Sequence, residues 1–275
     1  MTGRSAAGAA GAAGGRSTGV TLDRTNSGEP ASSETSSVTD VLVAVAHGTR
    51  APEGPVVLAA LLDRVRGLLP GVDVRVAYVD VISPTLESVL ESVPHGVRPV
   101  VVPMFLASGY HVRVDVPSAV AADGGRAVVT PALGPDAAVV AAVEERLRSS
   151  SPDGLPDAVV LAAAGSSDAS ALAEVSTAES LLASSLGRPV VAGYVTTASP
   201  SVPEAVTSLR AAGHSTVGVA SYLLAPGLFQ QRLDSVGADV VAPPIGPHPL
   251  VAELIADRYR SSRRPASVRR RRWPA

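Results

Sequence analysis

Two histidines of this chain lie where predicted strands end. His47 follows a six-residue apolar run and begins the segment His-Gly-Thr-Arg at 47–50, and His111 follows a second apolar run that starts at Val100. Apolar runs of this kind are typical of buried parallel strands, and open parallel sheets bind ligands beyond the carboxyl ends of their strands. Imidazole binds transition metals and accepts protons near neutral pH. The positions of the two histidines therefore predict metal or proton chemistry at this edge of a sheet.

The composition excludes several other kinds of chemistry. The 275 residues include no Cys, so His and carboxylates are the only strong ligands available for a transition metal. All 23 basic residues are Arg, which excludes catalysis through a lysine Schiff base or a Walker-type lysine. The chain contains no Gly-x-Gly-x-x-Gly motif, and its one Gly-x-Ser-x-Gly match, at 15–19, lies in the Ala-, Gly- and Ser-rich start of the chain. A metal-dependent hydrolase, which would need a phosphate or acyl cradle, is therefore not favoured.

Charge and hydropathy limit the partners. The net charge is −2 although six Arg lie between Arg263 and Arg272, so the rest of the chain is more acidic and a nucleic-acid-binding core is not expected. No apolar run reaches the length of a membrane span, and residues 5–15 lack the Leu-rich centre of a signal peptide. We expect a cytoplasmic protein with no membrane partner.

An alternation of strand and helix patterns surrounds the two histidines. The chain is 46% hydrophobic but only 3% aromatic, and a core of Ala, Val and Leu suits parallel strands covered by helices. Pro84 and Pro135 are expected in the first turns of two helices. The first half is predicted to contain strands near 41–46, 72–79, 98–105 and 127–131, and helices near 54–69, 84–94, 115–123 and 135–149.

The same layout begins again after a polar linker at 149–156, which predicts two homologous lobes. We expect a disordered segment at 1–38, lobes at 39–150 and 151–262, and a basic disordered tail at 263–275. The halves share turn-forming residues, at Gly48 and Gly165, Tyr78 and Tyr194, Ser83-Pro84 and Ser199-Pro200, and Gly109 and Gly227.

The halves differ at three positions that could do chemistry. His47 aligns with Ala164, Asp80 with Thr196, and His111 with Phe229. All three ionisable groups are missing from the second half together, as expected if they act at one site. The alternative for a single histidine at a strand end is a structural hydrogen-bonding role. Asp115, just before Pro117, fits a helix N-cap as well as a functional carboxylate.

The motifs together resemble a known family. The segments His-Gly-Thr-Arg (47–50), Tyr-Val-Asp followed by Ser-Pro (78–84), and Pro-Met-Phe-Leu-Ala-Ser-Gly-Tyr-His-Val-Arg-Val-Asp-Val-Pro (103–117) resemble the sirohydrochlorin chelatases in their two-lobed form, over about residues 40 to 260. These class II cobalto- and ferrochelatases insert a metal into a tetrapyrrole. The resemblance implies two Rossmann-like α/β lobes, each a parallel sheet flanked by helices, with the tetrapyrrole in the cleft between them.

The resemblance also implies roles for single residues. His47 and His111 would bind the metal and assist the pyrrole protons, and Asp80 would act with them where the family more often has Glu. The substrate carries many carboxylates, so Arg50 and Arg113, which flank the histidines, are candidate contacts. Leu106, Tyr110 and, across the cleft, Leu228 and Phe229 would pack on the macrocycle.

Metal insertion fits these residue types on chemical grounds. Entry of a divalent ion releases two N–H protons, and imidazole is suited both to accept them and to hold Fe²⁺ or Co²⁺. We expect no cofactor beyond the substrate metal, and a monomer or small homo-oligomer. The residues do not choose between iron and cobalt, or between sirohaem and cobalamin synthesis. A non-catalytic protein that binds or delivers the metal or the tetrapyrrole is the alternative.

Overall fold

The computed structural model describes residues 40–263, which belong to one compact unit. The disordered segment expected at 1–38 and nearly all of the expected basic tail lie outside the described residues. No helix within residues 40–263 is long and apolar enough to cross a membrane.

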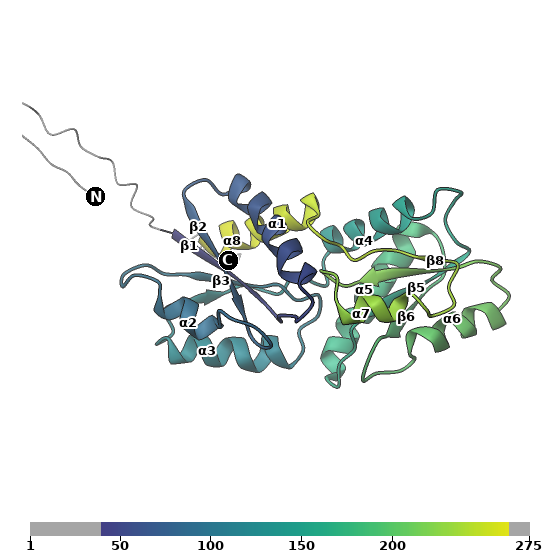
Figure 1. The fold of residues 1–275 in the computed structure, drawn as a ribbon, viewed down its shortest axis with the longest axis horizontal. Coiled ribbons are helices and arrows are strands. Elements are labelled where there is room, and N and C mark those ends of the chain that lie inside the picture. The colour runs from purple at the N-terminus through teal and green to yellow at the C-terminus, as the bar shows by residue number, and fades with distance from the viewer. Residues whose placement is uncertain (1–39, 264–275) are drawn as a thin grey trace, which may run out of the picture. The chain divides into compact units, whose positions relative to one another are not determined.

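The first half alternates strands and helices around a four-stranded parallel sheet (Figure 1). The strand order is β2-β1-β3-β4, and every neighbouring pair is parallel. The elements are β1 (Asp40–Ala46), α1 (Glu53–Leu68), β2 (Val72–Tyr78), α2 (Leu86–Glu91), β3 (Val100–Pro103), a π-helical turn η1 (His111–Asp115), α3 (Val116–Ala122), β4 (Val128–Val129) and α4 (Ala137–Ser149).

The second half repeats this order with a second parallel sheet, β6-β5-β7-β8. The expected fold class, two α/β lobes each built on a parallel sheet, is therefore confirmed. The elements are β5 (Ala158–Ala163), α5 (Ala169–Leu186), β6 (Val190–Tyr194), α6 (Val202–Ala211), β7 (Val217–Tyr222), α7 (Leu228–Leu233), β8 (Val240–Val241) and α8 (Pro249–Arg263).

The central strands are buried on both faces, as the apolar runs predict. β1, apart from Asp40, and all of β5 are buried, because helices cover each sheet on both sides. One face of the first sheet packs under α2 and α3. The corresponding face of the second sheet packs under α6 and α7.

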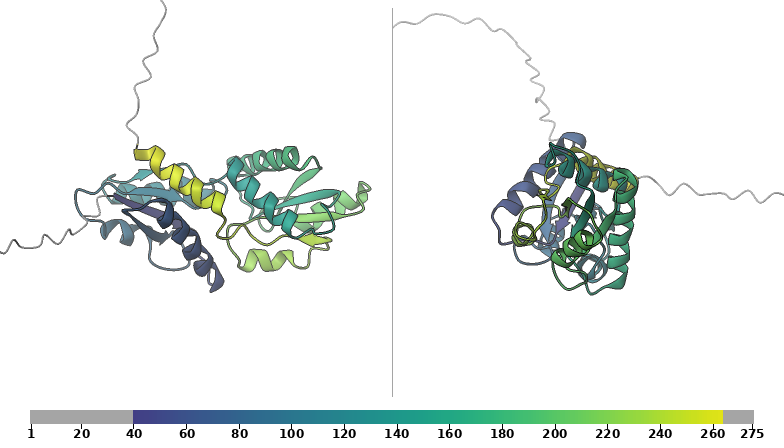
Figure 2. Two further views of the ribbon diagram at one scale, coloured as in Figure 1. Left: turned by 90° about the horizontal axis from the view of Figure 1, so that it is seen from above. Right: turned by 90° about the vertical axis from the view of Figure 1, so that its right-hand side faces the viewer.

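The last helix of each half packs on the other half. α4 lies on β7 of the second sheet, where Leu147 meets Gly218, and on the helix α5. α8 returns to the first half and lies against α1 and β3 (Figure 2). Arg260 of α8 donates to the carbonyl of Leu68 at 2.9 Å. The expected division near residue 150 follows the sequence repeat, but the packing crosses it because the apolar faces of α4 and α8 are buried against the opposite sheets.

The structure corrects the expected role of two prolines. Pro84 and Pro135 were predicted inside first helical turns, but both follow cis peptide bonds and precede the helices α2 and α4. Each helix instead begins after a capping side chain, Thr85 or Asp136, which accepts a hydrogen bond from a backbone N–H of the first turn.

Candidate metal and tetrapyrrole site

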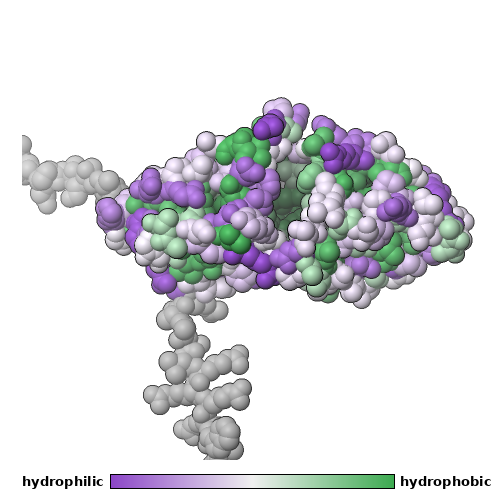
Figure 3. All heavy atoms as spheres, turned by 90° about the horizontal axis from the view of Figure 1, so that it is seen from below, coloured by the Kyte–Doolittle hydropathy of each residue, from purple (hydrophilic) through white to green (hydrophobic). Residues whose placement is uncertain are grey.

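A cleft of about 1140 Å³ lies where the carboxyl ends of the strands of both sheets meet. Figure 3 shows a hollow between the two halves. The volume exceeds the usual range of about 300–1,000 Å³ for small-molecule pockets, so the cleft can hold a large ligand. Its walls combine apolar side chains with a few polar ones, as ligand sites commonly do.

The two predicted histidines come together in this cleft. His47 follows β1 and His111 begins η1, and their ring centroids are 4.6 Å apart with the planes nearly perpendicular. They are 64 positions apart in the sequence, so only the parallel pairing of β1 with β3 brings them side by side. The two rings are close enough to bind one metal ion together.

Hydrogen bonds occupy the same ring nitrogen of each histidine. Nδ1 of His47 lies 3.2 Å from the carbonyl oxygen of Gly48, and Nδ1 of His111 lies 2.6 Å from Oδ2 of Asp115. Such contacts orient a metal-binding imidazole and leave Nε2 as the ligand atom. Both rings therefore have a hydrogen-bond partner at Nδ1 of the kind that orients metal-binding histidines.

The structure decides between the two roles that the sequence left open for Asp115, a helix N-cap and a functional carboxylate. Its carboxylate makes no capping hydrogen bond to α3, although it occupies the N-cap position, and instead contacts His111. The residues stand four positions apart, which places them on one helical face. This spacing is the sequence signal by which Asp115 could have been identified as the partner of His111.

Asp80 lines the cleft but does not complete a metal cluster. Its backbone N–H donates to the carbonyl of His47 at 3.1 Å, while its exposed carboxylate accepts from the N–H of Val81. Within residues 40–263 there is no group of three His, Asp or Glu side chains placed to hold a metal ion. Of the three ionisable residues predicted to act together, the structure thus brings the rings of His47 and His111 into contact.

The predicted substrate contacts divide into two groups. Arg50 lines the cleft from the first half, together with Leu106 and Tyr110, and Phe229 and Leu228 face them from the second half. Arg113 is not among the lining residues. Its guanidinium contacts Asp168 and Glu174 of the second half, so Arg113 takes part in a contact between the halves.

Sequence reasoning missed the groups that hold the cleft together. The hydroxyl of Tyr222, at the end of β7, donates to the carbonyl of Leu106 at 3.0 Å, and burial raises the pKa of Tyr222 above its ordinary value. Glu174 of α5 accepts from the backbone N–H of Ser108 at 2.5 Å. These contacts join residues that are 66 and 116 positions apart, so no local sequence pattern predicts them.

The fold and the histidine pair define a class of protein, a two-lobed α/β protein with a large cleft between its lobes and two facing imidazoles inside it. The chain belongs to the CbiX family, whose family model matches residues 41–150 and 158–262. The family resemblance inferred from the motifs is therefore confirmed. The two matched stretches are the two halves of the repeat.

Individual relatives agree with this placement. The chain is 25% identical over 239 residues to the sirohydrochlorin ferrochelatase of Priestia megaterium, covering 81% of this chain and 90% of that one. SirB from Bacillus subtilis, solved with Fe³⁺, superposes with a TM-score of 0.68 at 24% identity over 82% of this chain and 95% of SirB. The cobalt complex of SirB from Bacillus subtilis subspecies spizizenii gives 0.67 at 23% identity, with 82% and 95% covered.

Proposed function

We propose that this protein is a sirohydrochlorin chelatase that inserts Fe²⁺ or Co²⁺ into the macrocycle. The observation that carries the proposal is the pair of facing imidazoles in a cleft large enough for a tetrapyrrole. The family membership and the ferrochelatase relative support the substrate, and the SirB structures with iron and cobalt support the metals.

The histidine pair can hold the metal and then release it. Nε2 of His47 and Nε2 of His111 would bind the ion, while its other coordination positions remain open to water and then to pyrrole nitrogens. Imidazole nitrogen suits both Fe²⁺ and Co²⁺. Two protein ligands bind less firmly than four macrocycle nitrogens, so the ion transfers to the tetrapyrrole.

The same imidazoles can accept the protons that insertion releases. Each metal ion that enters the free-base macrocycle displaces two N–H protons, and each departing ion frees Nε2 of two histidines. Asp115 would stabilise the protonated ring of His111 through the contact at Nδ1, as carboxylates do for catalytic imidazoles. The metal and the tetrapyrrole are then the only reactants that the chemistry requires.

The apolar and charged walls would orient the substrate. Leu106 and Tyr110 on one side and Leu228 and Phe229 on the other would contact the macrocycle faces, and Arg50 would pair with a rim carboxylate. Asp80, at the edge of the cleft, would assist proton transfer. Because one chain supplies both walls, a monomer is sufficient for activity.

Catalysis is tested with the purified full-length chain and sirohydrochlorin under anaerobic conditions. We expect addition of Fe²⁺ or Co²⁺ to change the macrocycle absorption spectrum faster than the same mixture without protein. A protein that binds the tetrapyrrole or the metal with no acceleration of insertion would contradict the proposal and would identify a binding or delivery protein.

A further inference from the structure

The loop of residues 104–110, which leads from β3 to His111, is fastened to the second half of the molecule. Tyr222 donates to the carbonyl of Leu106, and Glu174 accepts from the N–H of Ser108. The Ser108 carbonyl accepts from Nε of Arg113 at 2.7 Å. Both backbone polar groups of Ser108 are therefore occupied, on the segment that carries the metal-binding His111.

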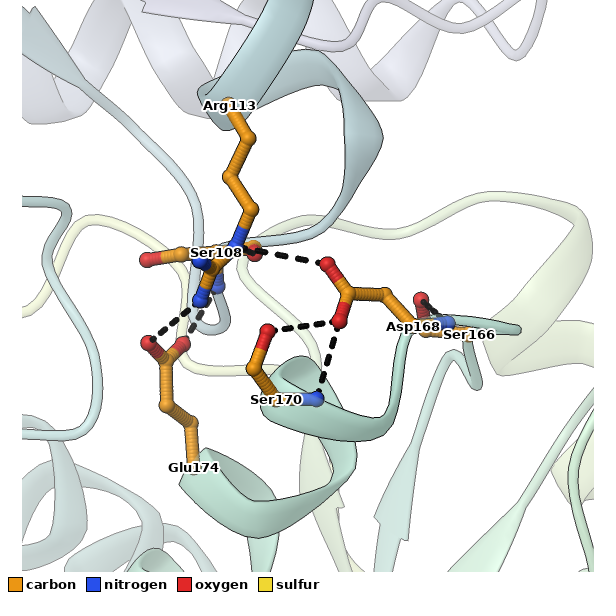
Figure 4. A network of polar contacts seen from close by, with 6 residues as sticks. All are labelled: Ser108, Arg113, Ser166, Asp168, Ser170 and Glu174. Carbon is orange, nitrogen blue, oxygen red and sulfur yellow. Dashed lines mark hydrogen bonds and ion pairs between the residues drawn. The ribbon is translucent and has the colours of Figure 1, made fainter.

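Arg113 lies at the centre of these contacts (Figure 4). It stands two positions after His111 in the same π-helical turn. Besides Ser108, its Nε lies 3.3 Å from Oδ2 of Asp168, and one of its terminal nitrogens lies 3.8 Å from Oε1 of Glu174. One guanidinium thus joins the loop before His111, the turn that contains His111 and the first turns of α5.

The acidic side of this network is itself held in place. Asp168 caps α5 and accepts from the backbone N–H of Ser170 at 2.9 Å and from its hydroxyl at 2.5 Å. These hydrogen bonds, followed by the charge of Arg113, keep the pKa of Asp168 below its ordinary value. Because α5 is an 18-residue helix packed into the core, its amino end is a rigid attachment point.

The internal repeat shows that this fastening exists on one side only. In the repeat alignment, Tyr222 corresponds to Met104, Asp168 to Ala51, Glu174 to Val57 and Arg113 to Gln231. None of the three counterparts of the second-half groups carries a charge or a hydroxyl. The loop that leads to Phe229 therefore lacks counterparts of the hydrogen bonds and ion pairs that hold the loop leading to His111. The network is present only in the half that contains the histidine.

We propose that Arg113 is a positioning residue, which holds the loop of residues 104–110 and the η1 turn against α5 so that His111 faces His47. The inference rests on the proposed function for its catalytic consequence, but not for its structural one. Ion pairs as exposed as these contribute little to global stability, so the contribution of Arg113 is to the geometry of the site. Arg113 acts through His111 and does not contact the macrocycle.

The test compares R113M, which keeps much of the side-chain length without the charge, with R210M as a matched control. Arg210 has a similar exposure, 40% against 46%, and pairs with Asp239 within the second half, away from the cleft. Three properties are measured on the full-length chain: hydrogen exchange of residues 104–116, Co²⁺ affinity without tetrapyrrole, and steady-state kinetics.

In R113M we expect faster exchange in residues 104–116 and about tenfold weaker Co²⁺ binding, the lower end of the effect seen when outer-shell partners of a metal site are removed. We also expect kcat to fall with the KM for sirohydrochlorin unchanged. R113K, which keeps the charge without the planar fork, should recover part of each effect. E174Q should act in the same direction, and the R113M/E174Q double variant should lose less than the sum.

Other outcomes would overturn the inference. A raised KM with unchanged Co²⁺ affinity would make Arg113 a substrate contact, and unchanged exchange in residues 104–116 would show that Arg113 does not hold the loop. Equal effects of R113M and R210M would indicate a general loss of stability. If the wild-type chain inserts no metal, the proposed function fails while exchange and Co²⁺ affinity still decide the role of Arg113.

Discussion

The turns after the first two strands of each half are nearly identical in backbone and different in chemistry. In the first half, the N–H of Asp80 donates to the carbonyl of His47 and that of Tyr78 to the carbonyl of Pro84. In the second half, Thr196 and Tyr194 make the same bonds to Ala164 and Pro200. The repeated turn therefore needs none of the ionisable side chains, which are present only in the half where His47 and His111 face each other.

The largest loss of activity is expected from removing either of the histidines that distinguish the first half from the second. We expect H47A and H111A each to lower the rate of metal insertion by at least about a hundredfold, more than the loss of an outer-shell partner, because each removes a ligand. The fold should persist, since the second half forms the same turn with Ala164 in place of His47 and a helix, α7, with Phe229 in place of His111. Insertion kinetics and circular dichroism measure the two effects.

The control for these variants is H214A, because His214 lies in the turn after α6 and does not line the cleft. It should retain wild-type activity. Comparable activity in H47A, H111A and H214A would show that the site has been misplaced.

Substituting the shared glycines should affect both halves alike. Gly48 and Gly165 have φ of +96° and +97°, and a Cβ at either would overlap the carbonyl oxygen of Asp80 or Thr196. We expect G48A and G165A each to lower the free energy of unfolding by roughly 3 kcal/mol, from backbone strain and this overlap. Urea denaturation measures it.

G67A is the matched control for both glycine variants, because nothing lies within 4 Å of a Cβ added at Gly67 in α1. It should be neutral or slightly stabilising. If either G48A or G165A were tolerated as well as G67A, the two turns would not be equivalent.

The smallest change in stability is expected from replacing Asp157 in the second half, and this change should depend on pH. Hydrogen bonds from Thr216 lower the pKa of Asp157, so its stabilising contribution is present above the unfolded-state pKa of about 3.9 and is lost as the pH falls through the lower folded-state value. D157N should therefore be less stable than the wild type at pH 7, with the difference closing toward pH 2. The midpoints of urea denaturation of both proteins, measured between pH 7 and pH 2, give this stability difference. A difference that stays constant over this range would contradict the lowered pKa of Asp157.

Local patterns predicted the elements and the histidine pair because their causes are local. A buried strand such as β1 requires an apolar run, and the polar residues that follow it are visible directly in the sequence. The joint replacement of His47, Asp80 and His111 in the second half indicated one site before any geometry was known. Asp115 was within reach of the same reasoning through its spacing from His111.

The remaining features depend on contacts between distant segments. Nothing around Arg113 shows that its partners lie on α5, and its position beside a histidine favoured a substrate contact instead. Likewise, the apolar stripe of α4 shows that one face is buried but not which sheet covers it. Such choices are decided by tertiary packing, which a single sequence does not display.

The exchange of α4 and α8 between the halves has a consequence for how the chain can be divided. A fragment that stops after α4 would expose the face of Val139, Val143 and Leu147, and its own sheet would lack the cover that α8 provides. Two such fragments could satisfy each other by trading their last helices. The duplicated chain thus has the connectivity of a helix-swapped pair fused into a single polypeptide.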